Sequence, residues 1–281
     1  MKRGLNKRGQ ISVFIIIAVI IVAATGIGFF VYQNQVDNEY FSSSEIKPQY
    51  DKLINSIIAC QETTASESLE IIGLQGGYYK QPEKNVELEG VFIPYYYFDG
   101  IIDYPNKTDV ENNIASYVND NLRECIMNIN SDFNLKFNAI ETEVIIRNKN
   151  LDFSSDVNIK ISKDGKNTFF ELKNHPVTIS SELEAILELA YYFTDSHEEN
   201  PELYCIDCVA DMAEENDLYF DLIPINEIVS LIIISENHTS SEPYSFEFLN
   251  KYTGDETGVD IFDIAVEGDE EGEVPEAQEE E

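Results

Sequence analysis

Residues 157–173 read VNIKISKDGKNTFFELK, and this stretch decides the class of fold. On each side of Asp164-Gly165 apolar residues alternate with polar ones, which is the pattern of two half-buried strands. Aspartate and glycine both tolerate the positive φ angles of a two-residue hairpin turn. The same alternation recurs at 140–147, so this part of the chain is predicted to form antiparallel strands.

Helical periodicity appears on both sides of these strands. Leu53, Ile57 and Leu69 lie on one apolar stripe, which predicts a long helix over 48–74 that ends at Gly73 and Gly76-Gly77. A second helix is predicted to run from an N-cap at Asp109 to Ile126. Further helices are predicted at 182–194 and 202–216, and further strands at 218–225, 228–235 and 244–249. We therefore expect an α+β domain over residues 48–252, with an antiparallel sheet covered by three or four helices.

The N-terminal segment has the features of a membrane anchor. No charged residue occurs from Ile11 to Tyr32, and a helix of about 20 apolar residues crosses the hydrocarbon layer. Residues 1–9 form a basic leader, and positive flanks stay in the cytoplasm. We expect a transmembrane helix at 10–33, a polar stalk at 34–47 and an extracellular C-terminal domain. A removed secretory signal is the alternative, but its apolar core is usually only about 7–15 residues.

Two resemblances to known proteins follow from specific segments. The segment Lys7-Arg8-Gly9-Gln10-Ile11-Ser12 resembles the class III signal of archaeal type IV pilin-like proteins. The resemblance implies cleavage by a prepilin peptidase between Gly9 and Gln10. Phe14 stands at the fifth mature position, where that family often has a glutamate that helps subunits register in a filament. The rest of the chain resembles uncharacterised surface proteins of small-genome archaea, through segments that include Tyr95-Tyr96-Tyr97 and Cys205-Ile206-Asp207-Cys208.

Acidic residues dominate the composition. The net charge is −35, from 18 basic and 53 acidic residues. Such a chain repels nucleic acid, because binding to phosphates needs clustered lysine and arginine. It suits a cationic partner instead. Residues 253–281 contain no basic residue and few apolar ones, so we expect a disordered acidic tail there.

The four cysteines are Cys60, Cys125, Cys205 and Cys208. The compartment outside the membrane permits disulfides. Cys60 and Cys125 lie on the apolar stripes of two predicted helices, which favours the pairs Cys60–Cys125 and Cys205–Cys208. The alternative pairing joins the Cys205/Cys208 turn to the other two cysteines, and a four-thiolate zinc site is a further hypothesis. A redox-active Cys205-x-x-Cys208 is another, although the neighbouring acids Glu202 and Asp207 disfavour a thiolate there.

The remaining candidate sites are weaker. Tyr95, Tyr96 and Tyr97 could form a contact platform, but aromatic residues also pack well in ordinary strands. Two sequons, at Asn106 and Asn237, are candidate glycan acceptors on an exported domain. The three histidines, at positions 175, 197 and 238, are expected on the surface. No catalytic motif or metal-ligand spacing is present in the sequence, so no cofactor is expected.

Together these features predict a non-enzymatic, disulfide-bonded cell-surface glycoprotein that is held by a single membrane span. Its anchor is pilin-like, and we expect it to serve in adhesion or envelope assembly, with protein partners in the envelope or in a filament. Two alternatives remain from other classes of function. One is an extracellular receptor that binds a ligand on its sheet or on the tyrosine platform, and the other is an extracytoplasmic thiol–disulfide enzyme.

Overall fold

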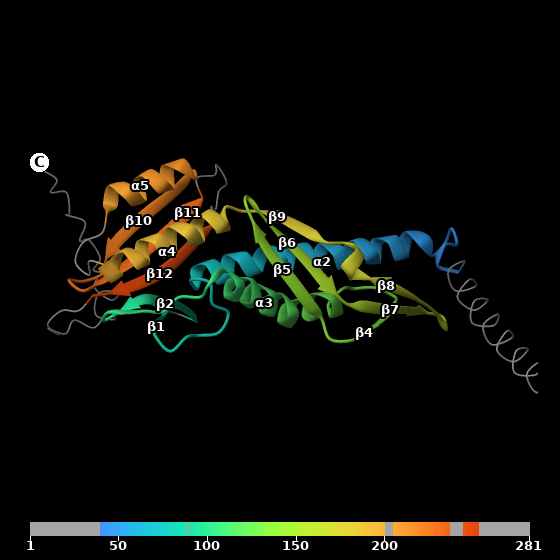
Figure 1. Ribbon diagram of the computed structural model, residues 1–281. Helices are drawn as coiled ribbons and strands as arrows, with labels where there is room; N and C mark the ends of the chain where they lie inside the picture. The colour runs from blue at the N-terminus through green and yellow to red at the C-terminus, as the bar shows by residue number, and fades with distance from the viewer. Residues whose placement is uncertain (1–39, 89, 200–204, 237–243, 253–281) are drawn as a thin grey trace, which may run out of the picture. The chain divides into compact units, whose positions relative to one another are not determined.

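The computed structural model describes residues 40–88, 90–199, 205–236 and 244–252 (Figure 1). Within these ranges no helix is long and apolar enough to span a membrane. The predicted leader at 1–9, the transmembrane helix at 10–33 and the acidic tail at 253–281 lie outside the described residues. The described part is α+β, as expected, and it divides into two compact units.

The described residues form four α-helices and three β-sheets. The helices are α2 (Lys47–Leu74), α3 (Lys107–Met127), α4 (Leu183–Glu199) and α5 (Ile206–Glu215), and a 3-10 turn, η1, spans Leu172–Asn174. The strands are β1 (Asn85–Leu88), β2 (Val91–Phe98), β3 (Ile101–Ile102), β4 (Asn134–Phe137), β5 (Glu141–Arg147), β6 (Asn150–Asp156), β7 (Asn158–Lys163), β8 (Lys166–Glu171), β9 (Val177–Ser180), β10 (Leu218–Pro224), β11 (Val229–Glu236) and β12 (Ser245–Lys251).

The first unit contains the sheet β4-β7-β8, together with the first part of α2 and the last part of α3. The predicted hairpin is present: Asp164 and Gly165 have φ angles of 51° and 78°, and they connect β7 to β8. Ile159 and Ile161 of β7 are fully buried. Phe41 is buried as well, and its ring lies 6.1 Å from that of Phe133. Part of the predicted stalk therefore belongs to the core of this unit. Burying the large apolar surface of an aromatic ring is more favourable than leaving it in water.

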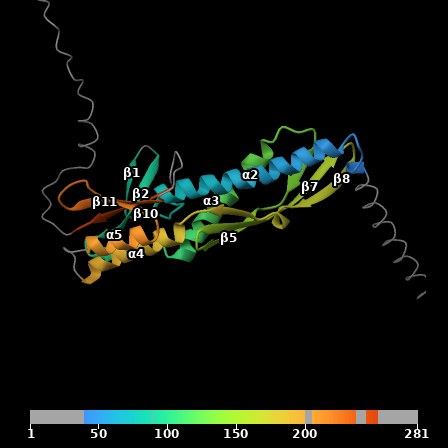
Figure 2. The same cartoon turned by 90° about the horizontal axis from the view of Figure 1, so that it is seen from above.

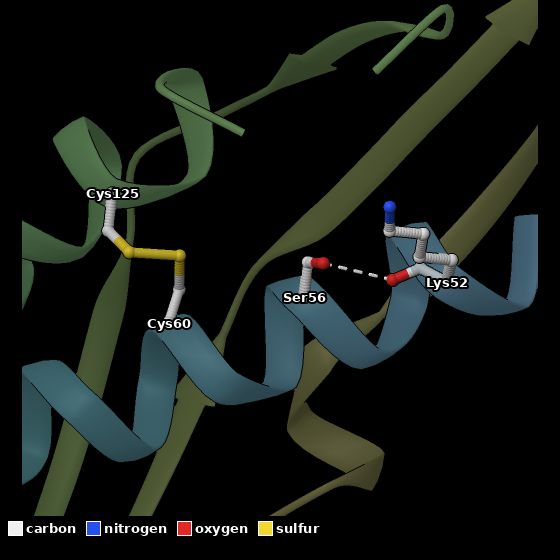
Figure 3. The surroundings of a disulfide bond; sticks show 4 residues. All are labelled: Lys52, Ser56, Cys60 and Cys125. Atoms are coloured by element: carbon white, nitrogen blue, oxygen red, sulfur yellow. Dashed lines mark hydrogen bonds between the residues drawn. A yellow bond between two sulfur atoms is a disulfide. The ribbon is translucent and has the colours of Figure 1, made fainter. Parts of the chain in front are cut away.

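A disulfide between Cys60 and Cys125 joins α2 to α3 within the first unit (Figure 3). The Cα atoms lie 5.7 Å apart, within the range that a disulfide requires. Cys60 is only 7% exposed, so the bond lies in a packed environment. This is the pairing that the apolar stripes of the two helices predict.

The second unit contains the largest sheet, in the order β1-β2-β12-β11-β10, with β3 also paired to β2. Most neighbours are antiparallel, but β12 pairs with β2 in parallel, with Leu249 opposite Tyr95. The expectation of an antiparallel sheet was therefore wrong, because this sheet is mixed. A two-residue period assigns side chains to the faces of a strand, but it does not specify the neighbour or its direction.

Helices α4 and α5 cover one face of this sheet (Figures 1 and 2). The buried side chains on the sheet are large and mostly aromatic: Tyr96 stacks on Phe248 with ring centroids 4.3 Å apart, and Phe246 lies at its edge. The Tyr96 hydroxyl donates a hydrogen bond of 2.9 Å to the carbonyl of Gly76. A buried phenol needs such a partner, so this contact also fixes the turn after α2.

The start of α4 is capped by a side chain from β11. The carboxylate of Glu236 is buried, and it accepts hydrogen bonds from the Ser181 hydroxyl at 2.7 Å and from the Glu182 backbone N–H at 2.6 Å. The first N–H groups of a helix lack partners within the helix, and its N-terminus favours negative charge. Glu236 thus positions α4 on the sheet, and α4 in turn leads to α5.

The predicted end of the first helix is confirmed, because α2 ends at Leu74. Gly73 lies in its last turn and does not end it; the backbone carbonyl of Ser245 approaches too closely to leave room for a side chain at this position. At the start of α3 the cap is Asn106 rather than Asp109. The Asn106 side chain accepts from the Asp109 N–H, and the Asp109 carboxylate accepts from the Asn106 N–H. This reciprocal pair is a capping box, which places the aspartate at the third helical position.

The two disulfides should differ sharply in their effect on stability. Cys60 and Cys125 are 65 residues apart, and closing a loop of that length constrains the unfolded chain by about 4 kcal/mol. A three-residue separation, as between Cys205 and Cys208, gives about 2 kcal/mol or less. We expect the double variant Cys60→Ala/Cys125→Ala to lose on the order of 10 °C in Tm, measured by circular dichroism. The matched control Cys205→Ala/Cys208→Ala should lose much less, and equal losses would contradict this assignment.

Candidate functional site

The strongest candidate site is the start of α5. Cys205 and Cys208 form a disulfide there, with Cα atoms 5.2 Å apart. Cys205 is the N-cap residue, and its Sγ accepts a hydrogen bond of 3.2 Å from the backbone N–H of Cys208. Sulfur thus takes the role that an oxygen usually has at this position, and it satisfies one N–H group of the first turn.

This disulfide is open to solvent, unlike Cys60–Cys125. Cys205 and Asp207 are exposed, and Cys208 is half-buried. Ile206, between the two cysteines, is 65% exposed, which is unusual for a large apolar residue in a folded domain. A thiol from another molecule can therefore approach this sulfur pair without opening the core.

A shallow groove lies along α5 and includes Ile206, the residue between the two cysteines. Its volume is about 370 Å³. The lining residues come from α5 and from the following turn and strand β10: Ile206, Ala210, Ala213, Glu214, Asp217, Leu218, Tyr219 and Phe220. Tyr219 is 55% exposed. The groove therefore offers an apolar surface, which begins at the residue between the two cysteines.

The surroundings of the groove are strongly acidic. Asp207, Asp211, Glu214 and Glu215 are exposed on α5, and Asp217 follows the helix. The sequence contains no lysine or arginine between Lys173 and Lys251. This negative field attracts cationic groups. It also counteracts the partial positive charge of the helix N-terminus, which by itself favours a thiolate at Cys205.

The tyrosine platform considered from the sequence is not formed. Tyr95, Tyr96 and Tyr97 are 8%, 0% and 2% exposed. Burial raises the pKa of Tyr96 well above its usual value of 10. These rings pack in the core of the second unit, so the packing interpretation was right and the binding interpretation was wrong.

His197 is buried, so its predicted position on the surface was wrong. Its ring lies 5.2 Å from that of Tyr97 and 5.1 Å from that of Phe193, and its Nε2 is 3.3 Å from the Tyr252 hydroxyl. Burial lowers the pKa of His197 to about 4. Its position was detectable in the sequence, because it follows Phe193 by one helical turn on the apolar stripe of α4. His175 is exposed, as expected.

The remaining predicted sites have mixed outcomes. Asn106 is exposed and caps α3, so its role as a glycan acceptor stays a prediction. Asn237, His238 and the processing site at Gly9 and Gln10 lie outside the described residues.

In the part of the chain that the structure describes, no group of three metal-ligating side chains comes together. The zinc hypothesis has no support there, since the four cysteines form two separate disulfides.

Comparison of the chain with protein-family models, with curated proteins and with solved structures finds no match.

The burial of His197 predicts a pH-dependent stability. The ordinary pKa of histidine is 6.5, and here it is about 4, so between these values the unfolded chain binds a proton that the folded chain does not. Stability therefore falls as the pH drops through this window, by at most about 3 kcal/mol for this residue. We expect His197→Leu to show a smaller loss of Tm than the wild type between pH 6.5 and pH 4.

The matched control for this measurement is His175→Leu, which changes an exposed histidine and should keep the wild-type pH dependence. The comparison uses the slope of Tm against pH, because the absolute Tm also reports changes in packing. A wild-type slope in the His197 variant would contradict the assignment of this buried group.

Proposed function

We propose that this chain is a single-pass membrane protein of the archaeal cell surface, which holds its α+β domain outside the cytoplasm and serves in adhesion or envelope assembly. The observation that carries the proposal is the disulfide between the buried Cys60 and the half-buried Cys125. Such bonds form and persist in oxidising compartments, whereas the cytosol keeps thiols reduced. A fold that is braced in this way is suited to the outer face of a membrane.

The sequence supports the anchor independently. The segment 10–33 is apolar and long enough to cross a bilayer, and the basic leader at 1–9 orients it with the N-terminus inside. In this proposal a peptidase removes the leader after Gly9 and leaves Gln10 as the first mature residue. The helix that remains both anchors the domain and can pack against other subunits.

The resemblance to pilin-like proteins supports the choice of adhesion or envelope assembly. Filament formation is the less favoured form of this role, because Phe14 replaces the carboxylate that often registers the subunits. The net charge of −35 favours a cationic partner in the envelope, since opposite charge steers association. The receptor alternative is weaker, because its candidate platform of three tyrosines is buried.

The location of the domain can be tested with an impermeant thiol reagent on intact cells. The reporter is a single new cysteine, Asn148→Cys, at an exposed position between β5 and β6. It is placed in a Cys205→Ser/Cys208→Ser background, so that the structural disulfide is retained. We expect equal labelling in intact and in permeabilised cells.

The same background without the new cysteine is the matched control, and it should stay unlabelled because Cys60 and Cys125 are bonded to each other. Labelling of the reporter only after permeabilisation would place the domain on the cytoplasmic side and would reject the proposal.

A further inference from the structure

We propose that the Cys205–Cys208 disulfide is a thiol-exchange site, which oxidises a pair of cysteines on an apolar, lysine- or arginine-flanked segment of a partner protein. This activity goes beyond adhesion or envelope assembly, neither of which requires an exposed disulfide. It rests on the accessibility of the sulfurs, on the groove beside them and on the charge around that groove.

The position of the disulfide argues against a mainly structural role. Cys205 and Cys208 are three residues apart on the same helix, so the bond constrains little of the unfolded chain. It joins no second element, whereas Cys60–Cys125 joins α2 to α3. Exposure of Cys205 also leaves the bond open to attack, and accessibility is one of the factors that set exchange rates.

The exchange proceeds in two steps. A thiolate of the partner attacks Sγ of Cys205, the more exposed of the two residues. The Cys205–Cys208 bond breaks, and Cys208 leaves as a thiolate that takes up a proton. The second partner thiolate then attacks its own sulfur in the mixed disulfide. This step forms the partner's disulfide and releases Cys205 as a thiolate, which is protonated in turn. Two electrons and two protons pass from the partner dithiol to Cys205 and Cys208 in this single turnover.

The local hydrogen bond fits this order of events. The N–H of Cys208 donates to Sγ of Cys205, so it stabilises the charge on Cys205 when that sulfur leaves in the second step. The surrounding acids act on thiolates and not on the neutral disulfide. They disfavour both the thiolate that attacks and the thiolates that leave, and basic residues on the partner segment offset this effect.

The groove defines the chemistry of the partner. Ile206, Ala210 and Tyr219 line the groove, and Ile206 stands between the two cysteines in the sequence, so the segment that docks there is apolar. The rim carries Glu214 and Asp217, and no basic residue lies between Lys173 and Lys251 in the sequence. Flanking lysine or arginine on the partner is therefore attracted, whereas flanking acids are repelled.

The proposal can be tested with the full chain and two synthetic peptides. Both peptides contain Cys-Leu-Leu-Cys in the reduced form; one is flanked by lysines and the other by glutamates. The reaction is stopped with an alkylating reagent, and mass spectrometry then reports the oxidation state of each cysteine over time. We expect the lysine-flanked peptide to reduce Cys205–Cys208 on the order of tenfold faster than the glutamate-flanked peptide, or more. Added salt should diminish this difference.

Variants separate docking from simple exposure. Tyr219→Ala removes apolar surface from the groove without changing its charge, and it should slow the reaction of the lysine-flanked peptide. Phe169→Ala is the matched control on β8, because that aromatic residue is 60% exposed but does not line the groove, and this variant should react like the wild type. Cys60–Cys125 is the internal reference and should stay oxidised. Equal rates for the two peptides, or reduction of both disulfides together, would overturn the proposal.

Discussion

The disulfide between Cys60 and Cys125 is the constraint on which the rest of the structure depends. It ties α2 to α3 across 65 residues of sequence, and each of these helices contributes residues to both compact units. Helix α2 carries the largely buried Cys60 and ends where the turn at Gly76 meets Tyr96 of the main sheet. A covalent bond at this point limits how far the two helices can separate in the unfolded chain, and so favours their packing within the first unit.

Much of the fold was predictable from local patterns. The alternation around Asp164-Gly165 predicted the hairpin of β7 and β8. The apolar stripe of α2 predicted the extent of that helix, and it also predicted that Cys60 pairs with Cys125. The short strands β4 and β9 were missed, and so was β6, which has the buried polar residue Ser155 on its inward face. The parallel pairing of β12 with β2 could not be predicted either, because it joins strands that are far apart in the sequence.

The candidate site was only partly predictable. The spacing of Cys205 and Cys208 and their place at a helix start were visible in the sequence. The groove was not, because it depends on how Tyr219 of β10 packs beside α5 after the chain reverses at Asp217. The acids near the cysteines disfavour thiolates, and around an oxidised pair they select a partner whose lysine or arginine residues offset this effect. Burial of the tyrosines likewise depends on their place in the middle of the sheet.

The most direct test of this account is disulfide mapping of the protein from native membranes, with all accessible thiols alkylated before the cells are opened. We predict that mass spectrometry will recover a peptide pair joined through Cys60 and Cys125, with neither residue alkylated. This result would place the folded domain in an oxidising compartment, as the proposed function requires. Recovery of Cys60 and Cys125 as alkylated thiols would contradict both the brace and the extracellular location.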